Sequence, residues 1–484
     1  MNIEQTFLWH DYETFGANPS LDRPAQFAAI RTNTALEPLG DPINWYCQPA
    51  TDVLPHPIAS LITGITPQEA LKKGIIEAEF AARIHSEMME PGTCSVGYNS
   101  IRFDDEFSRN LFYRNFFDPY EREYKNNNSR WDLIDLARMC YALRPGGILW
   151  PEHEAGKPSF KLEHLSAANH IEHVGAHEAL SDVFATIGLA RLIQSRQPRL
   201  FDWALKMRDQ HHVMQMLNTA DPKPVLHTSS RIPAKRGCTT LVLPLSIYPD
   251  RKKSVIVYDL MVDPEPLLNM NAEDIADRLF TPVKDLPEGV ERIALKAIHT
   301  NHVPMVAPAA TLKDVDCQRI GLESQRCFAN AEKLLASLPQ IRNKVMDVFK
   351  PYPPGVDTDP DHMIYSGGFF SRHDRLLMDK IRNTEPVKLS QQNWPFTDRR
   401  LTEMLFRYRA RNFPHTLTQK ENRQWQIQRL ERLKHPADDR QLNPDTFTLA
   451  LSTARQEHQG DSHAQAILDH LEAWGIHLTG SVNL

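Results

Sequence analysis

The stretch from Phe7 to Gly16, FLWHDYETFG, constrains the fold more than any other part of the chain. Apolar residues lead into Asp11 and Glu13, and alternate side chains of a β-strand lie on one face. Two carboxylates on one face repel, and burying them together raises the pKa of at least one. A divalent cation removes this penalty and prefers oxygen ligands. The pattern predicts half of a magnesium or manganese site at the end of a strand. The alternative is a strand edge with two exposed acids.

Composition excludes several classes of protein. The chain has 484 residues and a net charge of −6, so any binding of nucleic acid requires local basic patches. The six cysteines form no CxxC pair, which argues against a zinc ribbon or a disulfide framework and favours a reducing cytoplasm. The N-terminus has no signal-peptide pattern. The chain contains no apolar run of about 18 residues, so a membrane span is not predicted.

The chain divides into regions of different character. Residues 1–198 alternate predicted strands and helices, which indicates an α/β domain. Residues 199–350 carry short β-rich segments whose spacing is typical of a small barrel or sandwich. The Pro- and Asp-rich segment 351–363 is predicted to be a linker. Residues 364–484 are predicted to be mainly helical.

Within the first region, hydrophobic patterns predict individual elements. Thr66 caps a helix that has Pro67 at its first position. Strands are expected at 6–10, 25–33, 43–49 and 94–98, and further helices at 80–89, 102–117, 130–143, 160–169 and 178–194.

Asp104 is a third candidate acid. It follows the predicted buried strand 94–98 and lies near the start of a helix, where free amide groups and the helix dipole stabilise a carboxylate. The simpler interpretation is an N-cap aspartate, and the neighbouring Asp105 is an equally suitable cap.

Asp182 and His177 lie together at the predicted helix 178–194. Asp182 is beside the apolar stripe of that helix, and a partly buried aspartate is costly unless it is paired or bound to a metal. A salt bridge at the rim is the alternative. His177 precedes the helix, where it could take a proton near pH 7 or could be an ordinary loop histidine. His164, His170 and His173 are near it, but without cysteine or HExxH a structural zinc site is not indicated.

These acids and the histidine occur in the order Asp11, Glu13, Asp104, His177 and Asp182. The set resembles the superfamily of 3′-to-5′ exonucleases named for four acids, in the subclass with a histidine five residues before the last aspartate. The whole chain resembles bacterial exonuclease I, in which the Phe-Asp pair at 103–104 selects Asp104 over Asp105. The matching motifs are HDYETFG, ITGITPQEA (62–70), YNSIRFDDE (98–106), NSRWDLIDLARMCYALRPGGI (128–148), PSFKLEHL (158–165), SRQPRLF (195–201) and FRYRARNFP (406–414).

The resemblance implies a ribonuclease-H-like exonuclease domain, an SH3-like β-barrel domain and an α-helical C-terminal domain around a groove for single-stranded DNA. The implied activity is processive 3′-to-5′ degradation to 5′-mononucleotides in DNA repair or recombination. One alternative is a 3′-to-5′ exoribonuclease of the same superfamily. Another is a non-catalytic binding protein, which is disfavoured because all five residues are present.

The resemblance also implies roles for the five residues. Asp11, Glu13 and Asp182 would hold two Mg²⁺ ions, with Mn²⁺ as a substitute, at a separation of roughly 4 Å. Asp104 would complete the acidic shell directly or through water. His177 would accept a proton from the attacking water. Glu13 would also contact the terminal 3′ hydroxyl.

Binding a single strand without sequence preference requires cations for phosphates and aromatic faces for bases. The residues predicted to bind substrate, besides Glu13, are Arg109, Tyr120, Tyr124, Arg138, Lys161 and Tyr365. Residues 399–440 carry 11 Lys and Arg against 5 Asp and Glu, so they form either a groove wall or a solvated helix face. By resemblance, the protein is a monomer that binds the acidic C-terminal tail of single-stranded-DNA-binding protein near Arg144.

Overall fold

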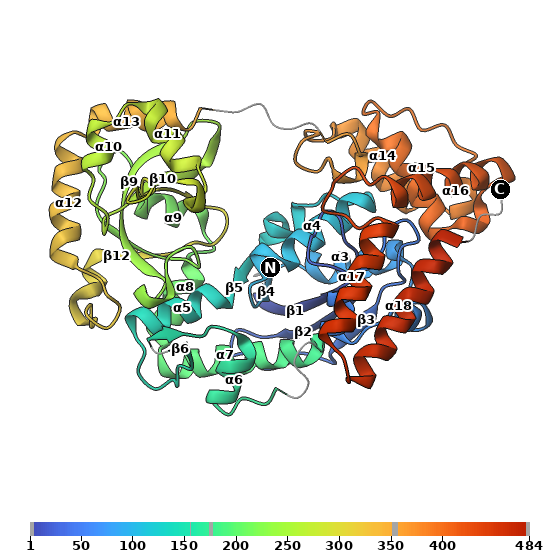
Figure 1. Ribbon diagram of the computed structural model, residues 1–484, viewed down its shortest axis with the longest axis horizontal. Helices are drawn as coiled ribbons and strands as arrows, with labels where there is room; N and C mark the ends of the chain where they lie inside the picture. The colour runs from blue at the N-terminus through green and yellow to red at the C-terminus, as the bar shows by residue number, and fades with distance from the viewer. Residues whose placement is uncertain (1–3, 155, 174–177, 351–356, 481–484) are drawn as a thin grey trace. The chain divides into compact units, whose positions relative to one another are not determined.

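The computed structural model describes residues 4–154, 156–173, 178–350 and 357–480 (Figure 1). The chain forms two compact units. The first contains Met1–Ser129, His173–Phe184 and Pro354–Leu484; the second contains Arg130–Glu172 and Ala185–Pro353. Helix α7 (Ala179–Arg196) begins in the first unit and continues in the second.

A mixed sheet of strand order β3-β2-β1-β4-β5 has its first four strands in the first unit. Strand β1 pairs antiparallel with β2 and parallel with β4, so it is covered on both edges. Its leading residues Phe7, Leu8 and Trp9 are at most 1% exposed, which explains their continuous apolar run. The strands are β1 (Thr6–Thr14), β2 (Pro24–Thr32), β3 (Ile43–Tyr46), β4 (Thr93–Gly97) and β5 (Ser129–Asp132).

Four helices of the first 129 residues belong to this unit: α1 (Pro57–Thr63), α2 (Pro67–Lys73), α3 (Glu77–Met89) and α4 (Asp104–Arg114). The predicted cap of α2 is confirmed, because the Thr66 side chain accepts a hydrogen bond from the Glu69 amide and Pro67 stands at the first turn. Apolar residues of α3 and α4, including Phe80, Ile84 and Phe112, pack with Leu8 and Phe27 of the sheet.

The C-terminal helices pack against the same sheet domain within the first unit. Tyr113 and Phe116 of the N-terminal part share a core with Met404 and Tyr408. Leu54 shares a second core with the last two helices. These helices are α14 (Arg372–Arg382), α15 (Arg400–Asn412), α16 (Gln419–Lys434), α17 (Pro444–Glu457) and α18 (Ser462–Gly480).

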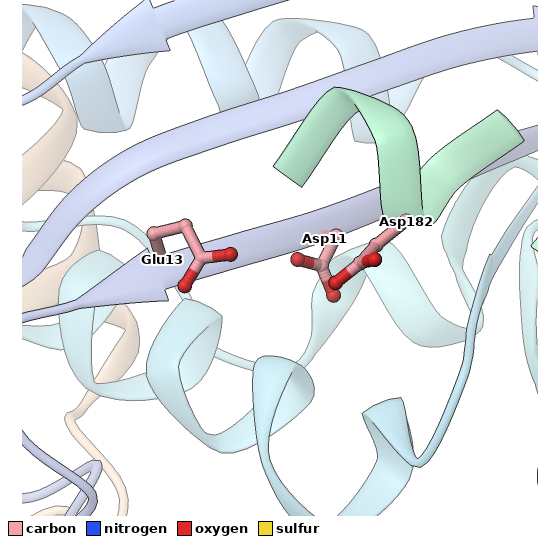
Figure 2. A group of neighbouring side chains, drawn as sticks. All are labelled: Asp11, Glu13 and Asp182. Atoms are coloured by element: carbon pink, nitrogen blue, oxygen red, sulfur yellow. The ribbon is translucent and has the colours of Figure 1, made fainter. Parts of the chain in front are cut away.

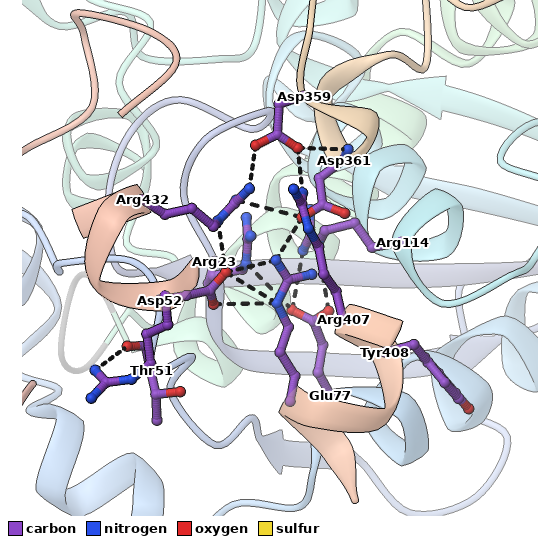
Figure 3. A network of polar contacts seen from close by, with 12 residues as sticks. Arg23, Thr51, Asp52, Glu77, Arg114, Asp359, Asp361, Arg407, Tyr408 and Arg432 are labelled. Atoms are coloured by element: carbon purple, nitrogen blue, oxygen red, sulfur yellow. Dashed lines mark hydrogen bonds and ion pairs between the residues drawn. The ribbon is translucent and has the colours of Figure 1, made fainter. Parts of the chain in front are cut away.

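A buried group of acids and arginines, here the ionic network, joins these parts of the first unit (Figure 3). Asp52 and Asp361 are 0% and 1% exposed, and Arg411 donates to both at 2.6 and 2.5 Å. The guanidinium groups hold the pKa of both carboxyls below its usual range, against the effect of burial. The other members are Arg23, Glu77, Arg114, Asp359, Arg407 and Arg432.

The second unit contains a five-stranded antiparallel sheet of order β11-β10-β9-β8-β12. Its strands are β8 (Val225–Thr228), β9 (Thr239–Tyr248), β10 (Arg251–Asp259), β11 (Leu295–His299) and β12 (Met305–Pro308). The short strands β6 (Glu152–Glu154) and β7 (Lys157–Pro158) pair separately. The predicted β-rich middle region is therefore present.

Besides most of α7, the helices of the second unit are α5 (Leu133–Leu143), α6 (Leu162–Ala168), α8 (Pro198–Lys206), α9 (Gln210–Met216), α10 (Glu265–Asn269), α11 (Ala272–Phe280), α12 (Ser324–Ala336) and α13 (Leu338–Val348). Among the described residues, no helix combines the length and the hydropathy that crossing a membrane requires.

Candidate active site

Strand β1 places Asp11 and Glu13 on one face. In the antiparallel register with β2, Asp11 is opposite Ala28 and Glu13 is opposite Gln26, two positions apart on each strand. Figure 2 shows Asp11 beside Asp182, which comes from the first turns of α7, and Glu13 to the other side of Asp11. The predicted same-face arrangement of the first two acids is therefore present.

The three carboxylates converge closely enough to share a cation. One oxygen from each of Asp11, Glu13 and Asp182 lies within 4.8 Å of the others. In the part of the chain that the structure describes, this is the one group of three or more His, Cys, Asp or Glu side chains with such a spacing. Carboxylate oxygens are the donors that Mg²⁺ and Mn²⁺ prefer.

The electrostatics of this group favour a bound cation. Burial raises the pKa of Glu13 to about 9, and the charges of Asp182 and Asp104 add to this effect. Burial also raises the pKa of Asp11 well above its usual value, together with the charges of Asp104, Glu13 and Asp182. Without a cation the acids must therefore hold protons or repel one another. The residues fit a divalent metal, since burial and the charges of neighbouring acids raise both pKa values.

Asp104 and Asp105 are placed differently. Asp104 is 2% exposed, and its Oδ1 accepts a hydrogen bond of 3.0 Å from the Tyr12 amide, between the two acids of β1. Asp105 forms an ion pair of 2.6 Å with the fully buried Arg122. Asp104 thus belongs to the acidic group electrostatically, although it is not among the three residues with ligand spacing.

A cavity of about 560 Å³ in the first unit contains all four acids. Its wall also includes Ile58 and Ile62 of α1 and Phe103, so one acidic and one apolar surface meet there. Ile62 is 51% exposed, which makes it available to a ligand. The sequence interpretation missed α1, although Pro57 at its first position and the left-handed Gly64 (φ 70°) after its end are recognisable signals.

The predicted base, His177, lies outside the described residues. A different histidine reaches the acids: Nε2 of His173 contacts Oδ1 of Asp182. The sequence assigns no role to His173, yet its side chain is only 7% exposed. A loop histidine has no periodic pattern, so no signal in the sequence marked this contact.

The predicted substrate contacts differ in accessibility. Tyr124 and Tyr365 are 67% and 60% exposed, and the Lys161 side chain, near Glu163, is 59% exposed. Tyr120 is half-buried. These side chains are accessible to a ligand to different degrees.

Two of the arginines that are predicted to contact substrate form ion pairs within the protein. Arg109 is 5% exposed and forms ion pairs with Glu106 and Glu123, at 2.5 and 2.8 Å. Arg138 is 9% exposed and pairs with Asp135 at 2.5 Å. Neither guanidinium is an open cation on the surface.

Several arginines of the basic stretch 399–440 also form ion pairs within the protein. Arg407, Arg411 and Arg432 belong to the ionic network, and Arg409 pairs with Glu421 at 2.7 Å. Three of these arginines therefore pair with buried acids, and a fourth pairs with a partly exposed one, instead of forming an open basic wall.

Family models match the chain in three consecutive segments. They are an exonuclease model over residues 8–190, an exonuclease I SH3-like domain over 208–351 and an exonuclease I C-terminal domain over 358–478. This chain belongs to the exonuclease I family. The prediction of the family is confirmed, as is the order of an exonuclease domain, an SH3-like domain and a C-terminal domain.

Individual members of the exonuclease I family match over most of their length. Exodeoxyribonuclease I of Escherichia coli (strain K12) is 49% identical over 423 residues, which are 87% of this chain and 88% of the relative. The structure of E. coli exonuclease I with a dA16 oligonucleotide matches with a TM-score of 0.94 and 44% identity, over 98% of this chain and 100% of that one. A zinc-bound E. coli exonuclease I–single-stranded DNA complex matches with a TM-score of 0.93 and 44% identity, with the same coverage. The prediction of an exodeoxyribonuclease is therefore confirmed.

Proposed function

We propose that this protein is a metal-dependent 3′-to-5′ exonuclease that degrades single-stranded DNA processively to 5′-mononucleotides in DNA repair or recombination. The observation that carries the proposal is the convergence of Asp11, Glu13 and Asp182 in one cavity of an exonuclease I-family chain. The single-stranded DNA complexes of the E. coli relative support the choice of substrate. That relative also has a zinc-bound form, which supports a metal site.

The three carboxylates would hold the metal, and Mg²⁺ is the proposed ion because all three ligands are hard oxygens. When bound, two such ions would lower the pKa of a water molecule and stabilise charge on the reacting phosphate. Asp104, fixed by the Tyr12 amide, would keep the site acidic beside these ligands. Glu13 would accept a hydrogen bond from the terminal 3′ hydroxyl.

His177 is the proposed general base, which accepts the proton of the attacking water. A correctly placed base contributes about 10² to 10⁴ in rate. Its position four residues after His173 and five before Asp182 keeps it close to Asp182 along the chain.

The apolar wall of the cavity suits the terminal nucleobase. Ile58, Ile62 and Phe103 offer carbon surface next to carboxylates that would hold the sugar–phosphate end. Farther from the cavity, the accessible Tyr120, Tyr124, Tyr365 and Lys161 are the proposed contacts to bases and phosphates. We assign Arg109 and Arg138 supporting roles, because Arg109 contacts the Tyr365 hydroxyl at 3.3 Å and Arg138 lies over the Phe160 ring.

The second unit offers a pocket for a protein partner. A cavity of about 570 Å³ is lined by Arg144 and Arg199 together with Leu200, Trp203 and Pro308. Cationic and apolar side chains together suit an acidic peptide with apolar residues. We propose that the C-terminal tail of single-stranded-DNA-binding protein docks there. Arg144→Ala should weaken binding of that peptide in fluorescence anisotropy, whereas Arg326→Ala should not.

The experiment that tests the activity uses single-stranded DNA labelled at either end, with matched RNA and duplex DNA. Each substrate is incubated with Mg²⁺ or with EDTA, using wild type, Asp182→Asn, His177→Ala and the surface control His463→Ala. Rapid release of the 3′ label from single-stranded DNA, abolished by EDTA and by Asp182→Asn, is expected. RNA cleaved as fast as DNA would identify an exoribonuclease instead.

A further inference from the structure

His173 makes a contact with the acidic site that the proposed chemistry leaves unexplained. It lies between α6 and α7, and its Nε2 meets Oδ1 of Asp182. Both side chains are largely protected from water, with 7% and 19% of their surface exposed. An ionised carboxylate can only accept hydrogen bonds, so the imidazole nitrogen is the donor.

The chain leading to His173 has a defined path. After α6 ends at Ala168, His170 adopts a left-handed backbone (φ 54°), and the Ile171 amide donates to the Ser166 carbonyl at 2.9 Å. Within the second unit, Ile171 lies so close to α7 that a Cβ at Gly188 would be 2.5 Å from its Cγ2. A glycine at position 188 thus permits the close approach of the chain two residues before His173.

Asp182 is the acid of the site that most needs such support. Asp11 and Glu13 lie in the part of β1 that pairs with β2, and the Asp104 carboxylate is held by the Tyr12 amide. Asp182 comes instead from the start of a helix, after residues 174–177. Its charge adds to the repulsion felt by Asp11 and Glu13, which favours turning its carboxylate away from them.

We propose that His173 is a positioning residue, which holds one oxygen of Asp182 so that the carboxylate faces Asp11 and Glu13 and binds metal. Hydrogen bonds from a second layer of residues commonly fix the orientation of metal ligands in this way. The proposal rests on the proposed function only in that the three acids bind a divalent metal. His173 and His177 then have separate tasks, since one orients a ligand and the other accepts a proton.

The test measures metal binding directly. Isothermal titration calorimetry with Mn²⁺ is performed on metal-free wild type, His173→Leu, His173→Gln and the surface control His463→Leu. Loss of a hydrogen bond to a ligand typically weakens metal binding by about 10- to 100-fold. We expect that loss in His173→Leu, near-wild-type affinity in His173→Gln because its amide can donate from a similar position, and no change in His463→Leu.

Activity provides a second readout. His173→Leu should require a higher Mg²⁺ concentration for half-maximal rate, while the rate at saturating Mg²⁺ stays near that of wild type. His177→Ala should show the opposite, a lower maximal rate with unchanged Mn²⁺ affinity. Circular dichroism in EDTA checks folding, and His173→Phe, which keeps the ring volume without a donor, replaces the leucine variant if that variant unfolds.

Three results would overturn the role of His173. The first is an Mn²⁺ affinity of His173→Leu that equals or exceeds that of wild type. The second is a loss of Mn²⁺ affinity that His173→Gln does not restore. The third is a lower rate of His173→Leu at saturating Mg²⁺ with unchanged Mn²⁺ affinity. The first would mean that the imidazole only occupies the place of the cation. If wild type itself binds no Mn²⁺, the proposed metal-dependent function fails, which is distinguishable from failure of this inference.

Discussion

The first unit contains two buried groups of carboxylates, and the charges around them shift their pKa values in opposite directions. In the acidic site, Asp11 and Glu13 face other acids, and their pKa values are raised. In the ionic network, Asp52 and Asp361 face Arg411 and Arg432, and their pKa values are lowered. Arginines of the chain lower the pKa values of the network acids, whereas the charges that act on Asp11 and Glu13 are those of other acids. Buried acids that raise one another's pKa values therefore mark a place that suits a cation from solution.

The largest expected effect comes from removing one acid of the site. Asp182→Asn should lower activity about 10³-fold, because a bound metal stabilises the transition state by several kcal/mol. In EDTA the same variant should unfold at an equal or higher temperature than wild type, since one repelling charge is gone. Steady-state kinetics and thermal unfolding test both parts. A lower melting temperature in EDTA would mean that Asp182 stabilises the fold, which would contradict the mutual repulsion of the site acids.

Removing one acid of the network should have the opposite pattern. Asp361→Asn should destabilise the protein by about 3 to 5 kcal/mol, because Arg411 and Arg407 each lose one of their carboxylate partners inside the protein. Urea unfolding measures this change, and activity per folded molecule should stay near wild type. A stability equal to wild type would show that the network does not hold the C-terminal helices in place.

The pH dependence should also separate the two groups. Because the pKa of Glu13 is raised from 4.5 to about 9, the folded metal-free protein keeps a proton that the unfolded chain releases between these values. Stability in EDTA should therefore fall as pH rises from 6 to 8, by up to about 1.4 kcal/mol per pH unit. The lowered pKa values of the network acids instead predict loss of their stabilisation only below about pH 4.

Thermal unfolding at pH 6, 7 and 8, with EDTA or with Mg²⁺, measures this difference. The stabilisation by Mg²⁺ should grow with pH, because fewer protons compete for the carboxylates. Glu13→Gln should flatten the pH dependence in EDTA. An Mg²⁺ effect that is the same at all three pH values would contradict protonation of the site.

The smallest effect is expected at an exposed ion pair. Arg440 pairs with Asp438 at 2.5 Å, but its side chain is 70% exposed. Asp438→Asn should change stability by less than about 1 kcal/mol, as is usual for surface pairs. Comparison with Asp361→Asn shows whether the loss of stability comes from breaking any ion pair or from breaking a buried one. Equal effects of the two substitutions would refute the importance of burial.

Local rules predicted the faces of the strand and the helix on which three of the acids lie. Strand alternation placed Asp11 and Glu13 on one face, and the helix that begins at Ala179 placed Asp182 beside an apolar stripe in which Val183 and Ile187 are buried. The family resemblance selected Asp104 over Asp105, and the ion pair of Asp105 with Arg122 agrees with that selection. The strand alternation and the helix stripe depend on residues close in sequence.

Features that depend on distant residues were not predictable. Arg411 pairs with Asp52 across 359 positions, so the sequence of residues 399–440 alone could not distinguish buried ion pairs from a basic surface. Helix α1 has only seven residues, and part of its apolar surface lines a cavity instead of a core, which weakens its hydrophobic pattern. The contact of His173 with Asp182 depends on the path of a loop.

The central claim is that the acidic site is completed by a divalent cation, and calorimetry of Mn²⁺ binding at pH 7.5 tests it most directly. Titrations of metal-free protein in two buffers of different ionisation enthalpy report both affinity and protons released. We predict binding that releases protons in wild type and is lost in Asp11→Asn, because Glu13 has a pKa of about 9 before the cation binds. No binding to wild type, or unchanged binding to Asp11→Asn, would contradict the account.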